Sequence, residues 1–456
     1  MAVRVCEYWI RSSLSKFLKL LEPQFIPYIG RIKMSFETIS VIGLGYIGLP
    51  TAAMFASRKK KVIGVDVNQH AVDTINQGKI HIVEPDLDMM VHAAVTGGYL
   101  KAATTPEVAD AFLIAVPTPF LPCTEGDIPA PDLSYIEAAS EAIAPVLKKG
   151  DLVILESTSP VGATEQMAEW LAQARSDLTF PQTHGEQADV NIAHCPERVL
   201  PGHVVRELVE NDRVIGGLTA KCSARAVELY KTFVQGECVI TNARTAEMAK
   251  LTENSSRDVQ IAFANELSII CDKLDINVWE LISLANRHPR VNILQPGPGV
   301  GGHCIAVDPW FIVSKTPAEA QLIHAARMVN DSKPEWVIEK VKLAIFDFLQ
   351  ANPTKSAKDV TIACYGLAFK PDIDDLRESP AMHITKKISE MHSGRVLAVE
   401  PNVNIIPREL IGVELVEFYI ACKEADIQIL LVDHKAFREK TITNGLLIDT
   451  KGIWQK

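Results

Sequence analysis

The sequence contains no apolar run of the ~18 residues that a membrane-spanning helix requires. It also lacks a positive charge balance: 46 Lys and Arg residues face 56 Asp and Glu, which gives a formal net charge of −10. Nucleic-acid-binding proteins usually carry a basic surface, so we expect no nucleic-acid partner, and we expect no membrane partner. An anionic ligand would have to be bound by local Lys and Arg side chains.

The nine cysteines show no C-x-x-C spacing, so the sequence suggests neither a zinc ribbon nor a disulfide framework. An odd and dispersed set of cysteines is typical of reduced, cytoplasmic proteins. We therefore predict a soluble cytoplasmic protein that holds no metal ion.

Residues 1–33 differ in composition from the rest of the chain. They are basic, and Leu14, Phe17, Leu18 and Leu21 could line one face of a helix. A targeting or membrane-surface helix is one interpretation. The other is a start site placed too far upstream, which we favour because the segment has no signal-peptide core or cleavage site. We expect residues 1–33 not to be part of the fold.

From residue 38 onward, short β-branched runs alternate with longer amphipathic stretches, a pattern typical of βαβ units on a parallel sheet. Residues 220–350 carry almost no strand signal and include a long helical stretch, Thr245–Lys273, without Pro or Gly. The strands that the pattern predicts are Ile39–Ile42, Val62–Val65, Phe112–Val116, Leu152–Leu155, Val190–Ala193, Val360–Ala363, Arg395–Val399, Ile427–Val432 and Leu446–Ile448.

This layout predicts an α/β fold with two Rossmann-like parallel-sheet domains joined by a central helical domain. A chain of 456 residues suits two or three domains at about 150 residues each. We place the domains at residues 34–216, 217–335 and 336–456. Long connecting helices of this kind often carry a dimer interface, and we expect a homodimer.

The first predicted strand runs directly into the loop Gly43-Leu44-Gly45-Tyr46-Ile47-Gly48, and a helical stretch follows. Gly43 permits the tight turn, Gly45 lets the backbone approach a pyrophosphate, and Gly48 allows close packing of helix and strand. The free N–H groups of the helix N-terminus can then bind phosphate. Asp66 ends the next predicted strand, where its carboxylate would accept hydrogen bonds from ribose hydroxyls and repel a 2′-phosphate. The loop and Asp66 together predict NAD, rather than NADP, as the cofactor.

Hydroxyl side chains follow two further strands of the first predicted sheet. Thr118 lies in Pro117-Thr118-Pro119, and Thr158 lies in the segment 156–162 with Thr164 just beyond it. Ligands of open α/β sheets bind at the carboxyl ends of the strands, so these threonines are candidate cofactor contacts. They are also ordinary turn residues.

The segment Gly297–Cys304 places four glycines in front of a cysteine. A glycine-rich backbone can turn its N–H groups toward an anion. If a helix begins near Asp308–Pro309, Cys304 lies close to its N-terminus, where a thiol pKa can fall from ~8.5 into the range ~3.5–7.5. Nothing structural explains so much glycine before a buried thiol, so Cys304 is a candidate nucleophile. We expect the other eight cysteines to be inert.

Polar residues also gather on the long helical stretch. Lys250, Asn254 and Arg257 are spaced at i, i+4 and i+7, which places them on one face. Such a stripe is usually a solvated face. Apolar neighbours on the same helix and the poor helix propensity of Asn254 favour a site instead. A further polar run, Asn286–Arg290, could bind a phosphate or a sugar.

These motifs resemble those of the UDP-glucose/GDP-mannose dehydrogenase family from Met34 to the C-terminus. The resemblance implies an NAD-binding domain, a central dimerising domain and a C-terminal domain that binds the UDP portion of a UDP-sugar substrate. Cys304 matches the family's nucleophile and Lys250 its catalytic lysine. Asn254 and Asp308 match groups that position water or stabilise the oxyanion. Glu197 matches a glutamate assigned to water activation or thioester hydrolysis. Arg377 resembles a residue that reaches the NAD of a neighbouring subunit.

The resemblance also implies a set of substrate contacts: Lys250, Asn254, Arg198, Val199, Arg257, His288, Arg290, Gly301, Phe369, Lys370 and Lys451. Within the family, the 301–308 loop and the 287–290 run look most like the members that oxidise UDP-N-acetyl-D-mannosamine. Members that oxidise glucose usually carry Pro-Lys where this chain has Ala306-Val307. The alternative substrate is UDP-N-acetylglucosamine or another nucleotide sugar.

The chemistry so implied is a two-step oxidation of a primary alcohol to an acid, with Cys304 holding the intermediate aldehyde as a thiohemiacetal and then a thioester. The residues alone leave two rival interpretations open. A single-step NAD dehydrogenase acting on a hydroxy acid would use Lys250 and Asn254 and leave Cys304 structural. A non-catalytic NAD-sensing scaffold would use the acidic surface and the long helices.

Overall fold

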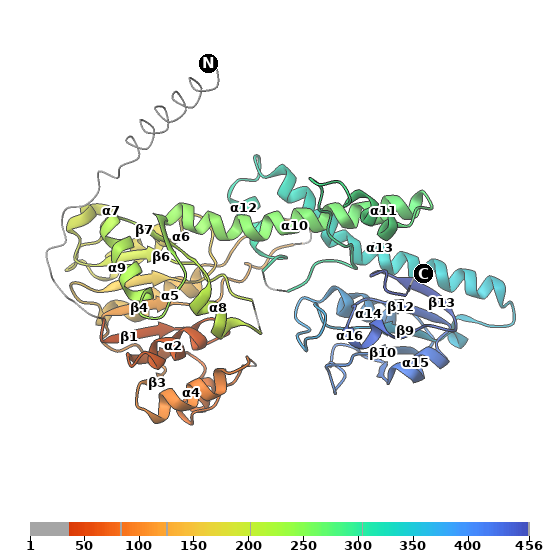
Figure 1. The fold of residues 1–456 in the computed structure, drawn as a ribbon, viewed down its shortest axis with the longest axis horizontal. Helices are drawn as coiled ribbons and strands as arrows, with labels where there is room; N and C mark the ends of the chain where they lie inside the picture. The colour runs from red at the N-terminus through yellow and green to blue at the C-terminus, as the bar shows by residue number, and fades with distance from the viewer. Residues whose placement is uncertain (1–35, 83, 125, 201, 303, 455–456) are drawn as a thin grey trace, which may run out of the picture. The chain divides into compact units, whose positions relative to one another are not determined.

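The computed structural model describes residues 36–82, 84–124, 126–200, 202–302 and 304–454 (Figure 1). The extension predicted for residues 1–33 lies outside the described residues. From Glu37 onward, the described chain forms one compact unit built around two β-sheets and a set of long helices.

The first sheet has the strand order β3-β2-β1-β4-β5-β6-β7-β8 among the described residues. All neighbouring strands pair in parallel except β6 and β7. The central strands β4 and β5 are buried along their whole length, as the runs AFLI and LVIL require in a parallel sheet that is covered on both faces. The strands are β1 (Thr38–Ile42), β2 (Lys61–Val65), β3 (Leu100–Ala103), β4 (Ala111–Ile114), β5 (Leu152–Leu155), β6 (Asn191–His194), β7 (Arg213–Gly217) and β8 (Cys238–Asn242).

Helices connect and cover these strands. The most enclosed of them is α2, which begins at Gly48 directly after the glycine loop and is buried from Gly48 to Ala56. The strand order reverses between β1 and β4, and the crevice outside the carboxyl ends of such a pair is the usual ligand site of open α/β sheets. The helices are α2 (Gly48–Ser57), α3 (Gln69–Asn76), α4 (Leu87–Thr96), α5 (Ser134–Ile143), α6 (Ala163–Ala174), α7 (Pro181–His184), α8 (Val204–Glu210) and α9 (Ala220–Tyr230), with short 3-10 turns at Ala144–Val146 and Gly185–Gln187.

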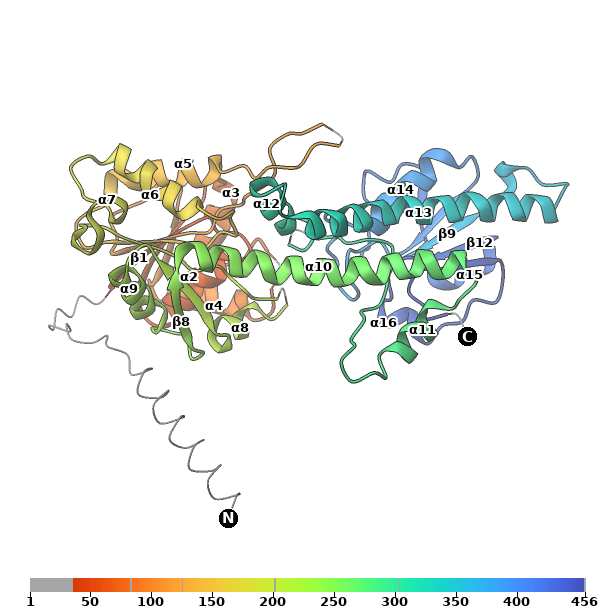
Figure 2. The ribbon, with the colours of Figure 1, turned by 90° about the horizontal axis from the view of Figure 1, so that it is seen from above.

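Two long helices run side by side through the middle of the chain, α10 (Ala243–Lys273) and α13 (Gln321–Ala351), as Figures 1 and 2 both show. Their shared face is polar: Arg327 donates to Asp258 at 2.6 Å, and Lys333 donates to Ser268 at 2.6 Å. Each partner in these pairs is buried, so the pairs fix how the helices lie against each other. Two shorter helices complete the segment, α11 (Val278–Ala285) and α12 (Asp308–Lys315).

The second sheet is parallel throughout, with the order β11-β10-β9-β12-β13 among the described residues. Its order reverses between β9 and β12, so it has a ligand crevice of the same kind as the first sheet. Its strands are β9 (Ile362–Tyr365), β10 (Val396–Val399), β11 (Val413–Leu415), β12 (Ile427–Leu430) and β13 (Leu446–Asp449), and its helices are α14 (Pro380–Met391), α15 (Phe418–Glu424) and α16 (Lys435–Arg438), with a 3-10 turn at Ala357–Asp359.

The predicted fold class is confirmed. The nine predicted strands overlap nine observed strands, and the predicted helix Thr245–Lys273 lies within α10. The expectation of almost no strand in residues 220–350 is wrong at one place, because β8 forms there and pairs with all five residues of β7. The first sheet therefore continues beyond residue 216. The strands β3, β7, β8 and β11 were not predicted; β3, β8 and β11 are edge strands, and β7 contains an arginine and two glycines.

Candidate active site

The glycine loop after β1 has the geometry of a phosphate cradle. Gly43 has a φ of +90°, and a Cβ added there would lie 2.6 Å from the carbonyl oxygen of Ala115. A Cβ on Gly48 would lie 1.8 Å from the carbonyl oxygen of Gly43. A Cβ on Gly45 would meet nothing within 4 Å, so Gly45 faces open space. Gly43 and Gly48 are thus required by the fold, and Gly45 leaves its backbone open to a ligand.

Asp66 follows β2 and reaches the same loop. Its carboxylate accepts a hydrogen bond from the N–H of Leu44 at 2.9 Å and another from the N–H of Asn68 at 2.9 Å. The side chain is only partly buried, so lone pairs remain for a ligand. An acceptor beside the phosphate cradle is what the ribose of NAD needs. The exposed Tyr46 of the loop lies beneath Arg377, whose guanidinium is 5.1 Å from the ring centroid.

Arg377 therefore lies at the glycine loop of its own chain. The family resemblance implied a contact with the NAD of a neighbouring subunit, and within its own chain the residue lies beside Tyr46. Its charge also acts on the thiol of Cys304. Arg377 thus contacts the cofactor loop, and its charge reaches the candidate nucleophile; a contact with NAD stays a prediction.

The three candidate threonines have different surroundings. Thr118 is half-buried and donates to the carbonyl oxygen of Thr158 at 2.6 Å, so the loops after β4 and β5 are joined. Thr164 is fully buried, and its hydroxyl and N–H both bind Glu247 of α10, at 2.6 and 2.8 Å. The structure shows Thr164 linking α6 to α10, and a contact between its side chain and NAD stays a prediction.

Cys304 lies in the turn before α12, as the sequence predicted. The N–H of Asp308, the first residue of the helix, donates to the carbonyl oxygen of Cys304 at 2.9 Å. The carboxylate of Asp308 is buried and accepts a hydrogen bond from the side-chain amide of Asn254 at 2.5 Å. Lys250 is close enough for its charge to act on both Asp308 and Cys304. Residues from α10 and from the turn before α12, far apart in sequence, thus meet in one cluster.

The electrostatics of this cluster contradict the expected low thiol pKa. Cys304 is exposed on one side, but loss of hydration on the others raises its pKa, and the carboxylate of Asp308 raises it further. Lys250 and Arg377 act in the opposite direction without compensating. The helix N-terminus favours an anion, but Asp308 already supplies one there. Burial raises the pKa of Asp308 itself to about 6 against the effects of Asn254 and Lys250.

Glu197 follows β6 and is buried against an arginine that the sequence had not indicated. One carboxylate oxygen accepts from the N–H of Arg198 at 2.7 Å, and the other pairs with the guanidinium of Arg213 at 2.6 Å. Arg213 is itself buried, with its guanidinium 4.9 Å from the ring centroid of Tyr230. The ion pair with Arg213 holds the Glu197 carboxylate in a fixed orientation.

The predicted substrate contacts are spread over several segments. Arg198 pairs with Glu253 of α10 at 2.5 Å, and Val199 next to it is half-buried. Arg257, His288 and Arg290 are exposed, and their contacts with a substrate stay predictions.

The glycine loop before Cys304 contacts the loop after β9. A Cβ on Gly302 would lie 2.9 Å from the ring of Phe369, and one on Gly301 would lie 2.9 Å from the Cβ of Phe369. Lys370, next to Phe369, is exposed. Lys451 pairs with Asp433 at 3.3 Å, and its ammonium lies 3.4 Å from the position of a Cβ on Gly297. The structure therefore brings Gly301, Phe369 and Lys451 to one stretch of glycine-rich backbone.

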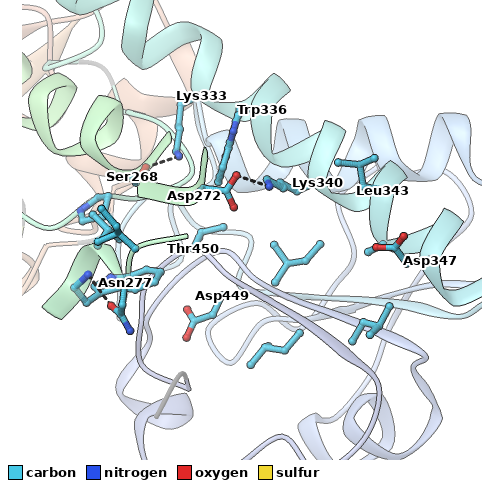
Figure 3. Close-up of a pocket in the computed structure, with 18 residues that line it drawn as sticks. Ser268, Asp272, Asn277, Lys333, Trp336, Lys340, Leu343, Asp347, Asp449 and Thr450 are labelled. Atoms are coloured by element: carbon cyan, nitrogen blue, oxygen red, sulfur yellow. Dashed lines mark hydrogen bonds and ion pairs between the residues drawn. The ribbon is translucent and has the colours of Figure 1, made fainter. Parts of the chain in front are cut away.

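The sequence did not indicate the residues that hydrogen-bond to the backbone of the glycine-rich loop before Cys304. Asn265 of α10 is fully buried, accepts from the N–H of Gly297 at 2.9 Å and donates to Asn330 of α13 at 2.9 Å. Pro296, the neighbour of Gly297 in sequence, helps to line a pocket of about 450 Å³ formed by parts of α10, α11, α13 and β13. Figure 3 shows Lys333 reaching Ser268 in the wall of this pocket. Polar residues inside a long helix are the only sequence signal for such positions.

In the part of the chain that the structure describes, no helix is long and apolar enough to span a membrane. Within the same ranges, no three or more His, Cys, Asp or Glu side chains are grouped so that they could hold a metal ion.

Family models match three consecutive segments. The NAD-binding domain of the UDP-glucose/GDP-mannose dehydrogenase family matches residues 37–234, its central domain matches 244–332, and its UDP-binding domain matches 363–456. The chain belongs to the UDP-glucose/GDP-mannose dehydrogenase family. It is an NAD-dependent dehydrogenase of a UDP-sugar, and the loop at Gly43–Gly48 with Asp66 fits the cofactor.

Members of the UDP-glucose/GDP-mannose dehydrogenase family cover nearly the whole described chain. A UDP-N-acetyl-D-mannosamine dehydrogenase of Yersinia pestis is 68% identical over 426 residues, 92% of this chain and 100% of the relative. An NDP-N-acetyl-D-galactosaminuronic acid dehydrogenase of Ralstonia nicotianae is 63% identical over 426 residues, 93% of this chain and 97% of the relative. The solved UDP-N-acetyl-mannosamine dehydrogenase of S. aureus is 41% identical with a TM-score of 0.78, covering 92% of this chain and 96% of that one.

Proposed function

We propose that the protein oxidises UDP-N-acetyl-D-mannosamine to UDP-N-acetyl-D-mannosaminuronate, with Cys304 as a covalent nucleophile. The observation that carries this proposal is the cluster at the start of α12, where the thiol of Cys304 lies among Lys250, Asn254 and Asp308. A single-step alcohol oxidation needs no thiol at this position. An oxidation of an alcohol to an acid does, because the aldehyde must be retained between two hydride transfers.

NAD, held by the Gly43–Gly48 loop and Asp66, would take up one hydride in each of the two oxidations. Between them, the sulfur of Cys304 adds to the aldehyde carbon, and the proton of the thiol passes to a neighbouring base. Asp308, with its pKa raised to about 6, is a carboxylate near neutral pH that can take this proton. Its proximity to Cys304 opposes a standing thiolate, so the thiol is expected to ionise as it reacts.

Lys250 and Asn254 would stabilise the negative charge that develops on the substrate. Negative charge develops on the substrate oxygen when sulfur adds, and the ammonium of Lys250 and the amide of Asn254 are donors on the same face of α10. A preorganised donor of this kind contributes ~3–4 kcal/mol in a dry site. The second oxidation yields a thioester, which water cleaves to the acid and the free thiol. Glu197, which Arg213 holds in a fixed orientation, is the base we assign to that water.

The choice of sugar rests on the relatives. The Yersinia relative is named for UDP-N-acetyl-D-mannosamine, and the Ralstonia relative, at 63% identity, is named for an N-acetylgalactosaminuronic acid. Both names carry an N-acetylated sugar, and this chain has the apolar pair Ala306-Val307 two residues after Cys304. The second candidate function is therefore the same chemistry on UDP-N-acetylglucosamine or another N-acetylated nucleotide sugar.

The test is a screen of NADH release with four substrates: UDP-N-acetylmannosamine, UDP-N-acetylglucosamine, UDP-glucose and GDP-mannose. We expect two NADH per uronate and the highest kcat/KM on UDP-N-acetylmannosamine. Cys304→Ala should bind NAD and UDP-sugar and produce no uronate. Full uronate production by this variant would contradict the covalent mechanism, and equal kcat/KM on UDP-glucose would contradict the substrate.

We also propose a cytoplasmic homodimer. Support for the dimer comes from an exposed apolar stripe on α10, where Phe263 is 50%, Ile270 45% and the following Leu274 61% exposed. Their spacing of seven and four residues places them on one face of the helix. Exposed apolar patches of this kind mark interaction surfaces.

A further inference from the structure

The loop after β9, residues Gly366–Asp372, is held at both ends by two buried side chains from neighbouring strands. Glu400 follows β10, and His434 lies four residues after β12, so both lie at the carboxyl end of the sheet, beside β9 (Figure 1). The side chains of both residues are fully buried. The proposed function gives no role to Glu400 or to His434.

Glu400 binds the start of the loop. One of its carboxylate oxygens accepts from the N–H of Leu367 at 2.7 Å and from the N–H of Ala368 at 3.1 Å. The other accepts from the N–H of Asn402 at 3.0 Å. Burial raises the pKa of Glu400, but these bonds and the bond to His434 outweigh it, so the pKa lies below its ordinary value. An ionised acceptor of several N–H groups is a strong anchor for a backbone.

His434 binds the end of the loop and thereby has only one possible tautomer. The N–H of Asp372 points at Nδ1 over 3.0 Å, and Nε2 lies 3.1 Å from the carboxylate of Glu400. A backbone N–H can only donate, so Nδ1 must be the acceptor. Nε2 then carries the proton and donates it to Glu400. A chain of hydrogen bonds thus runs from Asp372 through His434 and Glu400 to Leu367.

Between these two anchors lie Phe369 and Lys370. The ring of Phe369 packs against Gly302, and the backbone at Gly301 leaves no room for a side chain beside it. The conformation of the anchored loop therefore sets both where the Lys370 ammonium lies and what the glycine loop before Cys304 packs against.

We propose that Glu400 and His434 are positioning residues for the UDP portion of the substrate, acting through the backbone of the Gly366–Asp372 loop. The proposal rests on the proposed function, because it takes Phe369 and Lys370 as nucleotide contacts. Neither Glu400 nor His434 touches substrate. Their effect is to fix the loop before the substrate arrives, so that binding does not have to order it.

A purely structural role is the alternative, and the chain offers a matched control. His392 is also a buried histidine of this domain, with Nε2 2.8 Å from the carbonyl oxygen of Val360. Val360 lies before β9, at the end of the sheet opposite to the loop. His392→Phe removes a buried imidazole hydrogen bond that does not involve the loop, whereas His434→Phe removes the imidazole bonds to Asp372, Asn402 and Glu400 and so releases the loop.

The experiment measures the binding of uridine diphosphate and of NAD by calorimetry to the full chain and to the two variants. We expect His434→Phe to bind uridine diphosphate about tenfold more weakly, since two anchoring hydrogen bonds are lost, with NAD binding unchanged. His392→Phe should bind both ligands as the unmodified protein does. Equal binding of uridine diphosphate by all three proteins overturns the proposal. An unmodified protein that does not bind uridine diphosphate at all overturns the proposed function as well, so the two failures are distinguishable.

A second variant keeps the test valid if His434→Phe does not fold. Glu400→Gln has nearly the same shape and keeps one carbonyl oxygen for the loop, but it removes the charge. We expect its KM for the UDP-sugar to rise severalfold, with kcat and the KM for NAD little changed. A fall in kcat with an unchanged KM for the UDP-sugar would show that the pair does not act through nucleotide binding, and would overturn the proposal.

Discussion

Asp308 occupies a position that is favourable in one respect and costly in another. It is the first residue of α12, where a negative charge suits the helix dipole, yet its carboxyl is buried and its pKa is raised to about 6. Such strain at a functional group is typical of catalytic sites. The same feature makes Asp308 useful as a base in the reaction and costly for the stability of the fold.

The first prediction concerns the stability effect of Asp308. The pKa of Asp308 is 3.8 in the unfolded chain and about 6 in the folded protein. Rising pH therefore deprotonates the unfolded state first, which lowers the free energy of unfolding by up to ~3 kcal/mol at neutral pH. Asp308→Asn should therefore unfold at higher denaturant concentration than the unmodified protein at pH 7, with the difference vanishing below pH 4. Denaturant titrations across this range check it. A difference independent of pH would show that the carboxyl carries no such strain.

The second prediction concerns Asp66. Asp66→Ala should weaken NAD binding by ~1.5–3 kcal/mol, because charged hydrogen bonds to the ribose are lost, and should raise the relative tolerance for NADP. The structure adds a complication, since the carboxylate also holds the N–H of Leu44. Asp66→Asn keeps an oxygen for that bond and separates the two effects. Titration of each variant with NAD and NADP checks both, and unchanged NAD affinity in Asp66→Ala would refute the assignment.

At the scale of the elements, the packing of α10 against α13 includes the buried amine of Lys333. Protonation of this amine inside the fold lowers the free energy of unfolding. Lys333 is 2% exposed, contacts the ring of Trp336 at 3.5 Å, and has a pKa lowered by burial to about 7. In the unfolded chain the pKa of a lysine is about 10.5, so the side chain stays protonated below that pH. Folding therefore releases its proton, and the stability contributed by this site falls as the pH drops from 10.5 toward 7.

The third prediction follows for Lys333→Met. Removing the amine should raise the free energy of unfolding at pH 7 by roughly 1–3 kcal/mol after the lost contacts with Ser268 and Trp336 are subtracted. The gain should shrink toward pH 10. Lys342→Met, at an exposed position of the same helix paired with Glu339, serves as the control and should change stability by less than about 1 kcal/mol. A destabilised Lys333→Met at pH 7 would mean that the amine is net favourable where it lies.

The sequence predicted some strands accurately and missed others. Central strands such as Leu152–Leu155 were predicted to the residue, because burial on both faces leaves a continuous apolar run. The edge strand β8 was missed because it is largely exposed, with Val239 44% and Ile240 58% accessible. Within the site, spacing along one helix predicted the face shared by Lys250 and Asn254. Spacing could not predict Arg213 or Asn265, whose partners lie in other segments of the chain.

At the scale of the whole molecule, the fourth prediction concerns association. If the stripe Phe263, Ile270 and Leu274 is a dimer interface, Phe263→Glu should shift the protein from dimer to monomer, because a charge would be buried in an apolar contact. Light scattering after gel filtration measures the molecular mass. Tyr419→Glu, at a 77% exposed aromatic of α15, is the control and should leave the mass unchanged. A monomeric unmodified protein would contradict the dimer.

The continuity of β8 with α10 decides how this chain can be divided. Asn242 ends the strand and caps the helix, since its side chain accepts the N–H of Thr245 at 2.9 Å. A fragment cut after Gly216 would lose β8 and the last residue of β7. The remaining hydrogen-bonding groups of β7 would lie open along the sheet edge, and such an edge pairs with strands of other molecules. Such a fragment is expected to aggregate on expression. Chimeras that exchange cofactor halves between related enzymes would therefore have to carry residues 238–242 along with the half they transfer.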